Sequence, residues 1–298
     1  MKHLLIGDNS FLGISHLSQS RGRSTGLSLE TEDKVKIIEK AASCGATGFT
    51  FSTDPTNFQV LSGLASSNQI MEDFAVYPVL PYAARYVRVV NEKGITGLMN
   101  DILSRLSAME KAKLLVQSGI SALTFDPLGL MRAYMDYELS QIPKNTKIHS
   151  VLLHEVITDL AVSFGSTEIL QQFTKHIRHK WHAVPGFVTR NFTKFVDLCL
   201  KMNQPLSDIF IMAPFNSIGF QMNPSRESCE TCLSKMSDSN VIAMSILASG
   251  YLSLNDAITY IRHSSHISGV AVGVSSLDHA ENTFRKLQEL TSVKPTTS

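Results

Sequence analysis

The last third of the chain contains four short apolar runs that end in small or amide-bearing residues. The runs cover residues 186–191, 209–216, 241–250 and 270–276, and a helix-like segment follows each of them. Continuous apolar runs are typical of parallel strands buried on both faces, and repeated strand–helix units predict an α/β fold, a single (β/α)8 TIM barrel. Because the chemistry of such barrels sits at the carboxyl ends of the strands, we expect the site among the polar residues that close these runs.

The composition suits one globular domain. The chain has 298 residues, of which 43% are hydrophobic and 18% charged, and one α/β barrel fills roughly 250 residues. No linker rich in proline, glycine or serine divides the chain, so we expect one domain over residues 1–292 and a flexible tail over 293–298. The formal net charge of +1 gives no electrostatic sign of nucleic acid or an anionic membrane as partner. We expect a small-molecule ligand, and the oligomeric state stays open.

Cysteine usage and the amino terminus favour the cytoplasm. The four cysteines are too few and too scattered for a secreted disulfide framework. Only three consecutive large apolar residues precede Gly7, and no apolar stretch approaches the length needed to span a membrane.

The apolar runs give nine strand candidates, whereas a closed barrel needs eight. The candidates cover residues 4–6, 48–52, 76–80, 122–125, 150–154, 186–189, 210–214, 242–247 and 270–274. One of them is expected to be an extra strand, a cap across the bottom or no strand at all. The weakest are 4–6 and 122–125, and the choice between them stays open. Apolar residues at three- and four-residue spacing predict helices over 31–43, 103–117, 167–179, 192–202, 226–235, 254–262 and 277–290.

Several motifs resemble those of the aldo-keto reductases, a barrel family that uses NADPH. Leu152-Leu153-His154 resembles the strand that ends in the family's active-site histidine, and Gly186-Phe-Val-Thr-Arg-Asn191 is similar to its Gly-x-Ser-x-x-Asn strand. Phe215-Asn216 resembles an aromatic-Asn strand end, and the segments 248–252 and 273–282 resemble the phosphate- and adenine-binding part. The resemblance covers roughly half to two-thirds of the chain and makes NADP the candidate cofactor. It implies a cofactor site formed by Asn191, Asn216, Ser249, Gly250, Gly273, Ser275, Ser276 and Asn282.

The catalytic residues of that family are mostly missing. Thr50 stands where the family has its aspartate, the tyrosine position falls near Pro55 and Thr56, and the segment 77–82 contains no lysine. Only His154 remains of the four. Carbonyl reduction in the family needs a tyrosine acid whose pKa is lowered by the lysine. We therefore interpret the chain as a divergent aldo-keto-reductase-like barrel without the standard reductase site.

His154 and Glu155 close the fifth strand candidate. His154 could act as a general acid–base group or bind a metal, and Glu155 could orient it or act as a base. The alternative is a buried histidine that is hydrogen-bonded to the backbone, with Glu155 on the rim. Their place at a strand end favours the functional interpretation.

The turn formed by Gly273, Val274, Ser275 and Ser276 is a candidate anion site. It precedes a helix-like segment, and free backbone N–H groups at a helix start commonly bind phosphate in barrels. The alternative is a tight turn in which Ser276 or Asp278 caps the helix.

Other polar residues carry weaker signals. Asp8, Asp54 and Asp126 could bind a cation or cap helices, and Asp8 is the best candidate because Gly7 lets the backbone approach a ligand. Arg21 and Arg23 fit a solvated loop better than a lid. The pair Cys229 and Cys232 lacks a second pair of zinc ligands, and the histidines at 176, 179 and 182 fit a solvated helix face. We expect no metal site.

Two hypotheses for function follow. The first is an enzyme that acts on a small anionic metabolite, phosphorylated or carboxylated, with His154 as acid–base group supported by Glu155. Asp8, Asn9 and Arg190 would then be substrate contacts, with Asn191 and Asn216 orienting the substrate. The second is a non-catalytic ligand-binding or regulatory barrel derived from an NADP-dependent aldo-keto reductase.

Overall fold

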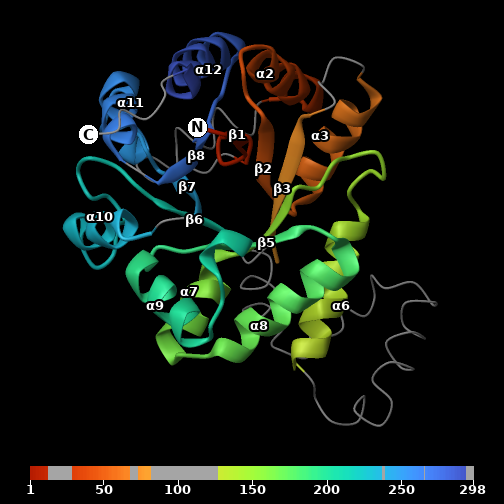
Figure 1. Cartoon of the computed structure of the whole chain (residues 1–298). Coiled ribbons are helices and arrows are strands. Elements are labelled where there is room, and N and C mark those ends of the chain that lie inside the picture. Colours follow the sequence, from red (N-terminus) through yellow and green to blue (C-terminus); the bar gives the residue numbers. More distant parts are fainter. Residues whose placement is uncertain (13–28, 68–72, 82–126, 237–238, 265, 293–298) are drawn as a thin grey trace, which may run out of the picture.

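The computed structural model describes residues 1–12, 29–67, 73–81, 127–236, 239–264 and 266–292. Eight parallel strands form a closed barrel in chain order, as predicted (Figure 1). The strands are β1 (His3–Gly7), β2 (Gly48–Ser52), β3 (Ala75–Leu80), β4 (Ser150–Leu153), β5 (Val184–Val188), β6 (Phe210–Pro214), β7 (Asn240–Met244) and β8 (Ile267–Gly273). The described α-helices are α2 (Thr31–Ser43), α3 (Pro55–Ser66), α6 (Pro127–Ser140), α7 (Glu155–Phe164), α8 (Thr167–His176), α9 (Phe192–Lys201), α10 (Arg226–Ser234), α11 (Leu254–His263) and α12 (Leu277–Ser292).

The barrel shows which of the nine predicted strands belong to it. The weak candidate at 4–6 is β1, which closes the barrel by pairing with both β2 and β8. The other weak candidate, 122–125, and the predicted helix at 103–117 lie outside the described residues. All eight barrel strands are therefore among the nine predicted segments.

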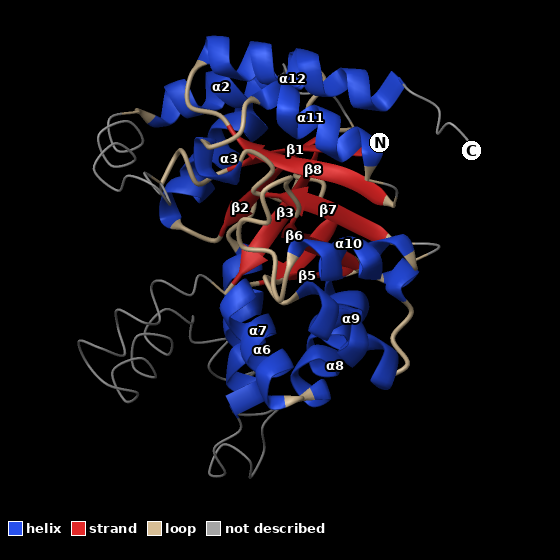
Figure 2. Cartoon of the chain, turned by 90° about the vertical axis from the view of Figure 1, so that its left-hand side faces the viewer, coloured by secondary structure: helices blue, strands red, loops and turns tan. Residues whose placement is uncertain are grey.

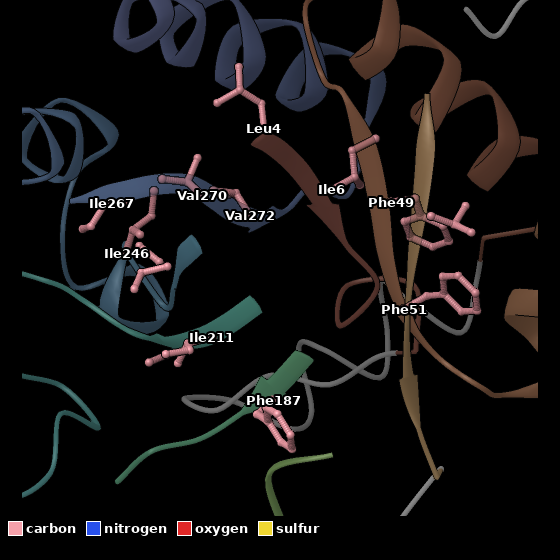
Figure 3. Packing of buried hydrophobic residues seen from close by; sticks show 14 of the residues in the cluster. Leu4, Ile6, Phe49, Phe51, Phe187, Ile211, Ile246, Ile267, Val270 and Val272 are labelled. Atoms are coloured by element: carbon pink, nitrogen blue, oxygen red, sulfur yellow. The ribbon is translucent and has the colours of Figure 1, made fainter. Parts of the chain in front are cut away.

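Four strands end earlier than predicted, and three of them, β4, β5 and β8, do so by a single residue. The candidate at 242–247 stops as β7 at Met244, because Ser245 has a positive φ of 54° and turns the chain into a loop. The apolar run continues past the strand because Ile246 packs into the core from this loop (Figure 3). Similarly, β4 ends at Leu153, and His154 is the N-cap of α7.

The helix predictions missed α3, α6 and α7, and α8 ends early. Asp54 caps α3, because its side chain accepts a hydrogen bond from the Thr56 amide at 2.8 Å and proline follows at the first helical position. The α-helical part of the segment predicted at 167–179 ends at His176 and continues as a π-helical turn, Ile177–Trp181. Gly45, with a φ of 102°, follows the end of α2 as predicted.

The core has two layers because side chains alternate across each strand. Leu4, Ile6, Phe49 and Phe51 face the surrounding helices (Figure 3). The inner layer fills the barrel with Leu5, Ala75, Tyr77, Leu152, Val188, Phe210, Met212 and Ile242. Figure 2 shows α2, α11 and α12 along one side of the barrel and α6, α7, α8 and α9 along the opposite side. No helix in the described part of the chain is long and apolar enough to cross a membrane.

Candidate functional site

The carboxyl ends of all eight strands share one rim, because every strand pair is parallel. His154 follows β4 and Asn216 lies just beyond β6, so the two residues lie at the same end of the barrel, as predicted. Val151, Val188, Ile211 and Val272 are buried on the strands, and Met244 is partly buried.

His154 is held in one tautomer by the start of α7. Its Nδ1 accepts a hydrogen bond from the Val156 amide at 3.2 Å, and its own amide donates to the Leu80 carbonyl at 2.8 Å. Burial lowers the pKa of the imidazole, while the Glu155 carboxylate opposes this shift and the Arg190 guanidinium adds to it. A neutral imidazole that accepts at Nδ1 carries its proton on Nε2. His154 is therefore a hydrogen-bond donor at the rim.

Glu155 pairs with Arg190 and not with His154. The Arg190 Nε lies 3.0 Å from one Glu155 carboxylate oxygen and an Nη lies 2.7 Å from the other. Two parallel N–H···O bonds of this kind fix the plane of the guanidinium. The structure thus brings His154, Glu155 and Arg190 together, with Glu155 oriented toward the arginine.

Asp159 supports this group, and the sequence analysis did not identify it. Its carboxylate accepts from the Thr189 hydroxyl at 2.5 Å and from the Arg190 amide at 3.2 Å. The Thr189 oxygen in turn accepts from the Asn191 amide at 2.9 Å. In the sequence, Asp159 could have been found from its position four residues after Glu155, because this spacing places both carboxylates on one face of a helix. The helix itself was not predicted.

Asn216 is buried, and its side-chain amide already holds two loops together. The amide nitrogen donates to the Phe220 carbonyl at 2.9 Å and to the Ser245 carbonyl at 3.3 Å, and the amide oxygen accepts from the Phe220 amide at 2.8 Å. Ser245, Ala248 and Ser249 all have positive φ values in the loop after β7. Asn216 therefore positions the rim backbone.

Asp8 lies behind the rim, between the ends of β1 and β2 and the start of α3. One carboxylate oxygen accepts from the Ser52 amide at 2.7 Å and from the Asn57 side chain at 2.8 Å. Burial raises the pKa of Asp8 to about 6, although these hydrogen bonds work in the opposite direction. The next residue, Asn9, is exposed.

The predicted anion turn connects β8 to α12. Gly273 lies in register with Gly7, and the Ser276 hydroxyl oxygen accepts from the His279 amide at 3.2 Å. Ser276 therefore caps α12, which was the alternative interpretation of this residue. Gly250 is exposed with a φ of 95°, and Asn282 is exposed on α12. An anion at this turn stays a prediction.

The cysteine pair and the histidine-rich helix have structural partners. Burial raises the pKa of the Cys229 thiol to about 11, and its Sγ lies 3.4 Å from the Asn223 carbonyl. His176 is mostly buried against Asp136 at 2.7 Å, so the predicted solvated face is wrong for this histidine. No group of three metal-ligating side chains occurs among the described residues.

Two hollows lie away from the rim. A groove of about 880 Å³ runs between α9 and α10, and a smaller hollow of about 370 Å³ lies beside Val184, at the amino end of β5. Neither is lined by His154, Arg190 or Asn216.

Comparison with known proteins finds a likeness of fold and none of sequence. No protein-family model and no curated protein sequence matches the chain. Among solved structures, a putative aldo-keto reductase from Pseudomonas aeruginosa superposes with a TM-score of 0.60 at 10% identity, covering 97% of this chain and 90% of that one. The holo form of an aldo-keto reductase from Bacillus halodurans gives a TM-score of 0.58 at 11% identity, covering 99% and 88%.

A third such structure is an aldo-keto reductase enzyme from a deep-sea metagenome library, with a TM-score of 0.51 at 11% identity and 91% of each chain covered. At these identities the likeness concerns the fold, which the barrel order and parallel register support independently. The chain therefore has the (β/α)8 barrel fold of the aldo-keto reductases.

Proposed function

We propose that the chain is an enzyme that acts on a small anionic metabolite at the carboxyl-end rim, with His154 as the acid–base group. One observation carries the proposal: the Val156 amide fixes the His154 tautomer at a strand end. Residues at this end of barrel strands are where catalytic groups of such folds lie. Fixing Nδ1 leaves Nε2 as the atom that donates to, or exchanges a proton with, a substrate oxygen.

Arg190 supplies a positive group whose charge acts on His154. Glu155 engages Nε and one Nη, so the remaining N–H groups of the guanidinium have no partner in the described part of the chain. A carboxylate or phosphate could bind along that edge with geometry already fixed by Glu155. The substrate would then place its anionic group on Arg190 and an adjacent oxygen on His154.

The turn before α12 is the second binding site for an anion. The amides of Leu277 and Asp278 begin the helix and have no partner within it. Gly7 and Gly273 add no side chain beside this turn, and the Ser10 Oγ would lie 3.3 Å from a Cβ on Gly273. A phosphorylated metabolite can use this turn, whereas a short carboxylate needs only Arg190.

The residues assigned to NADP by resemblance fit that cofactor poorly at one position. Asn216 would have to break its bonds to Phe220 and Ser245 before its amide could hold a nicotinamide. NADPH is therefore one ligand to test alongside the anions.

The test is a ligand panel that reads the shift in Tm, because a ligand that binds the native state raises apparent stability. The panel contains NADPH, sugar phosphates and dicarboxylates, with wild type, His154→Ala and Arg190→Gln. His263→Ala is the matched control, since His263 is exposed on α11. We expect at least one anion to stabilise the wild type and the His263 variant, and both rim variants to lose that shift. Shifts equal in all four proteins would contradict the proposal.

The alternative function is a non-catalytic ligand-binding barrel. It is favoured by the threonine at position 50 and by the missing lysine of the resembled family. Ligands that bind at the rim and are recovered unchanged after long incubation would support this alternative over the enzyme.

A further inference from the structure

One hydroxyl group inside the barrel mouth has no partner. Thr50 is 6% exposed, and its Oγ1 makes no hydrogen bond in the part of the chain that the structure describes. Its neighbours Phe49 and Phe51 face the helices (Figure 3), so alternation along β2 turns Thr50 toward the barrel interior. Buried polar groups are nearly always hydrogen-bonded in native proteins. An unpaired hydroxyl at this place therefore needs an explanation.

On the β1 and β8 side of Thr50 the wall carries almost no side chains, whereas on its other side Tyr77 of β3 is in register with it and buried. Thr50 is in register with Gly7, and Gly7 is in register with Gly273 on β8. The nearest atoms to a Cβ built on Gly7 would be backbone atoms of Val272 and Gly273, at 3.7 Å. Ala271 is the next inward residue below Gly273. The β8–β1–β2 wall is thus mostly backbone, with two hydroxyls: that of Thr50 and that of Ser10, whose Oγ would lie 3.3 Å from a Cβ on Gly273.

The remaining inner wall is filled by larger side chains. Leu152, Val188 and Met212 project into the barrel from β4, β5 and β6 and are buried there. The glycine side, formed by Gly7 and Gly273, is the part of the inner wall with the least side-chain bulk. A group that lies there meets no charge from the wall itself.

We propose that this wall is the subsite for a hydroxylated part of the substrate, and that Thr50 determines specificity by hydrogen-bonding to a substrate hydroxyl. The inference rests on the proposed function, which places the anionic group on the rim and His154 at an adjacent oxygen. A threonine hydroxyl both donates and accepts, which matches an alcohol better than it matches a carboxylate or an ammonium group. The substrate class is a small anion that carries hydroxyl groups, as sugar and polyol phosphates do.

A deoxy analogue would leave Thr50 unpaired in the complex. Sites built to bond a substrate hydroxyl reject the analogue that lacks it, because the buried partner stays without a hydrogen bond. The subsite therefore predicts discrimination between two anions that differ only in their hydroxyl groups.

The experiment compares glycerol 3-phosphate with n-propyl phosphate by thermal shift, on wild type, Thr50→Val and Thr50→Ser. The two probes share the phosphate and the carbon chain, and valine keeps the shape of threonine without the hydroxyl. We expect a larger shift with glycerol 3-phosphate in the wild type and in Thr50→Ser, and equal shifts in Thr50→Val. Thr53→Val is the matched control, because Thr53 is also buried with an unpaired hydroxyl but lies beyond the end of β2.

A second measurement is the Tm of the wild type and of Thr50→Val without ligand. Removing an unpaired buried hydroxyl should leave the Tm of Thr50→Val equal to that of the wild type or higher by about 2–6 °C. A lower Tm would show that the hydroxyl is bonded within the protein and would overturn the inference.

The outcomes also separate the inference from the proposed function. A discrimination that survives in Thr50→Val, or a wild type that responds to neither phosphate, overturns the subsite. The proposed function then still stands if another anion of the panel stabilises the wild type but not His154→Ala and Arg190→Gln.

Discussion

Arg190 and Glu155 form a two-pronged ion pair at the rim of the barrel, with N···O distances of 3.0 and 2.7 Å. The pair joins the segment after β5 to the first turn of α7. Its geometry holds the guanidinium beside His154, so the charge next to the imidazole has a fixed position. The pair therefore acts on both the stability of the rim and the titration of His154.

Breaking this pair should destabilise the fold modestly. The side chains are 33% and 25% exposed, so Arg190→Gln is expected to lower the free energy of unfolding by about 1 kcal/mol once solvent screening is allowed for. Urea denaturation of Arg190→Gln, Glu155→Gln and the double variant measures the coupling. Lys147→Gln, which breaks a largely exposed pair with Asp73, is the control and should change nothing measurable. Strictly additive effects at positions 155 and 190 would contradict the pair.

The titration of His154 should lie below the usual histidine range. Burial lowers its pKa, Glu155 raises it and Arg190 lowers it. Binding or catalysis that needs the neutral imidazole should therefore persist as the pH falls through 6.5 and fail only at lower pH. Glu155→Gln should lower the pH at which binding or catalysis fails, and Arg190→Gln should raise it. NMR titration of the His154 ring protons checks this, and a midpoint at or above 6.5 would refute it.

Asp8→Asn should stabilise the protein at neutral pH. The pKa of Asp8 rises from 3.8 to about 6 on folding, so the folded state binds a proton more tightly than the unfolded state. The protonated carboxyl stabilises the folded state fully below pH 3.8. This contribution to the free energy of unfolding, about 3 kcal/mol, is lost as the pH rises through about 6. The asparagine avoids that loss and keeps one acceptor for the Ser52 amide, so we expect a gain of about 2 kcal/mol at pH 7.5.

The gain should vanish near pH 4, and urea denaturation at the two pH values measures it. Asp197→Asn, at an exposed position on α9, should show no such dependence. A loss of stability at pH 7.5 in Asp8→Asn would mean that the carboxylate is stabilised by its surroundings.

Asp136→Asn should loosen the contact between α6 and the end of α8. The carboxylate accepts from His176 at 2.7 Å, Lys180 at 2.6 Å and Trp181 at 2.8 Å. Burial works to raise the pKa of Asp136, but these three donors hold it below its usual value. The charged form therefore contributes stability at pH 7 that is lost as the pH falls below 3.8.

We expect the variant to lose about 2 kcal/mol and to shift the fluorescence of Trp181, which is the single tryptophan of the chain. Asp208→Asn, at a more exposed acidic residue, is the control. Unchanged emission and stability would show that the three hydrogen bonds are weak.

The sequence predicted the barrel because buried parallel strands leave a simple trace in it. Continuous apolar runs located every strand, including β1, but they could not end β7, because Ile246 is apolar and yet packs from a loop. Helix α7 was missed since its exposed face carries Val156, Leu160 and Phe164 and so lacks the expected polar side.

The site was predictable only in part. Position at a strand end singled out His154, Glu155 and Arg190, but the pairing of Glu155 with Arg190 depends on the angle between α7 and β5. Thr50 drew attention only as a missing aspartate, because an unpaired hydroxyl is a property of the folded interior. Asp159 acts through a helix that the pattern did not reveal.

The position at which a ligand binds tests the proposed rim site most directly. NMR spectra of the histidine ring protons, recorded while the most stabilising ligand of the panel is added, distinguish the two ends of the barrel. His154 lies at the carboxyl-end rim, whereas His3 and His149 pack together with Tyr77 at the amino end. We expect the His154 signals to shift in proportion to occupancy while those of His3 and His149 stay in place. Shifts at His3 or His149 with an unchanged His154 would contradict the rim site.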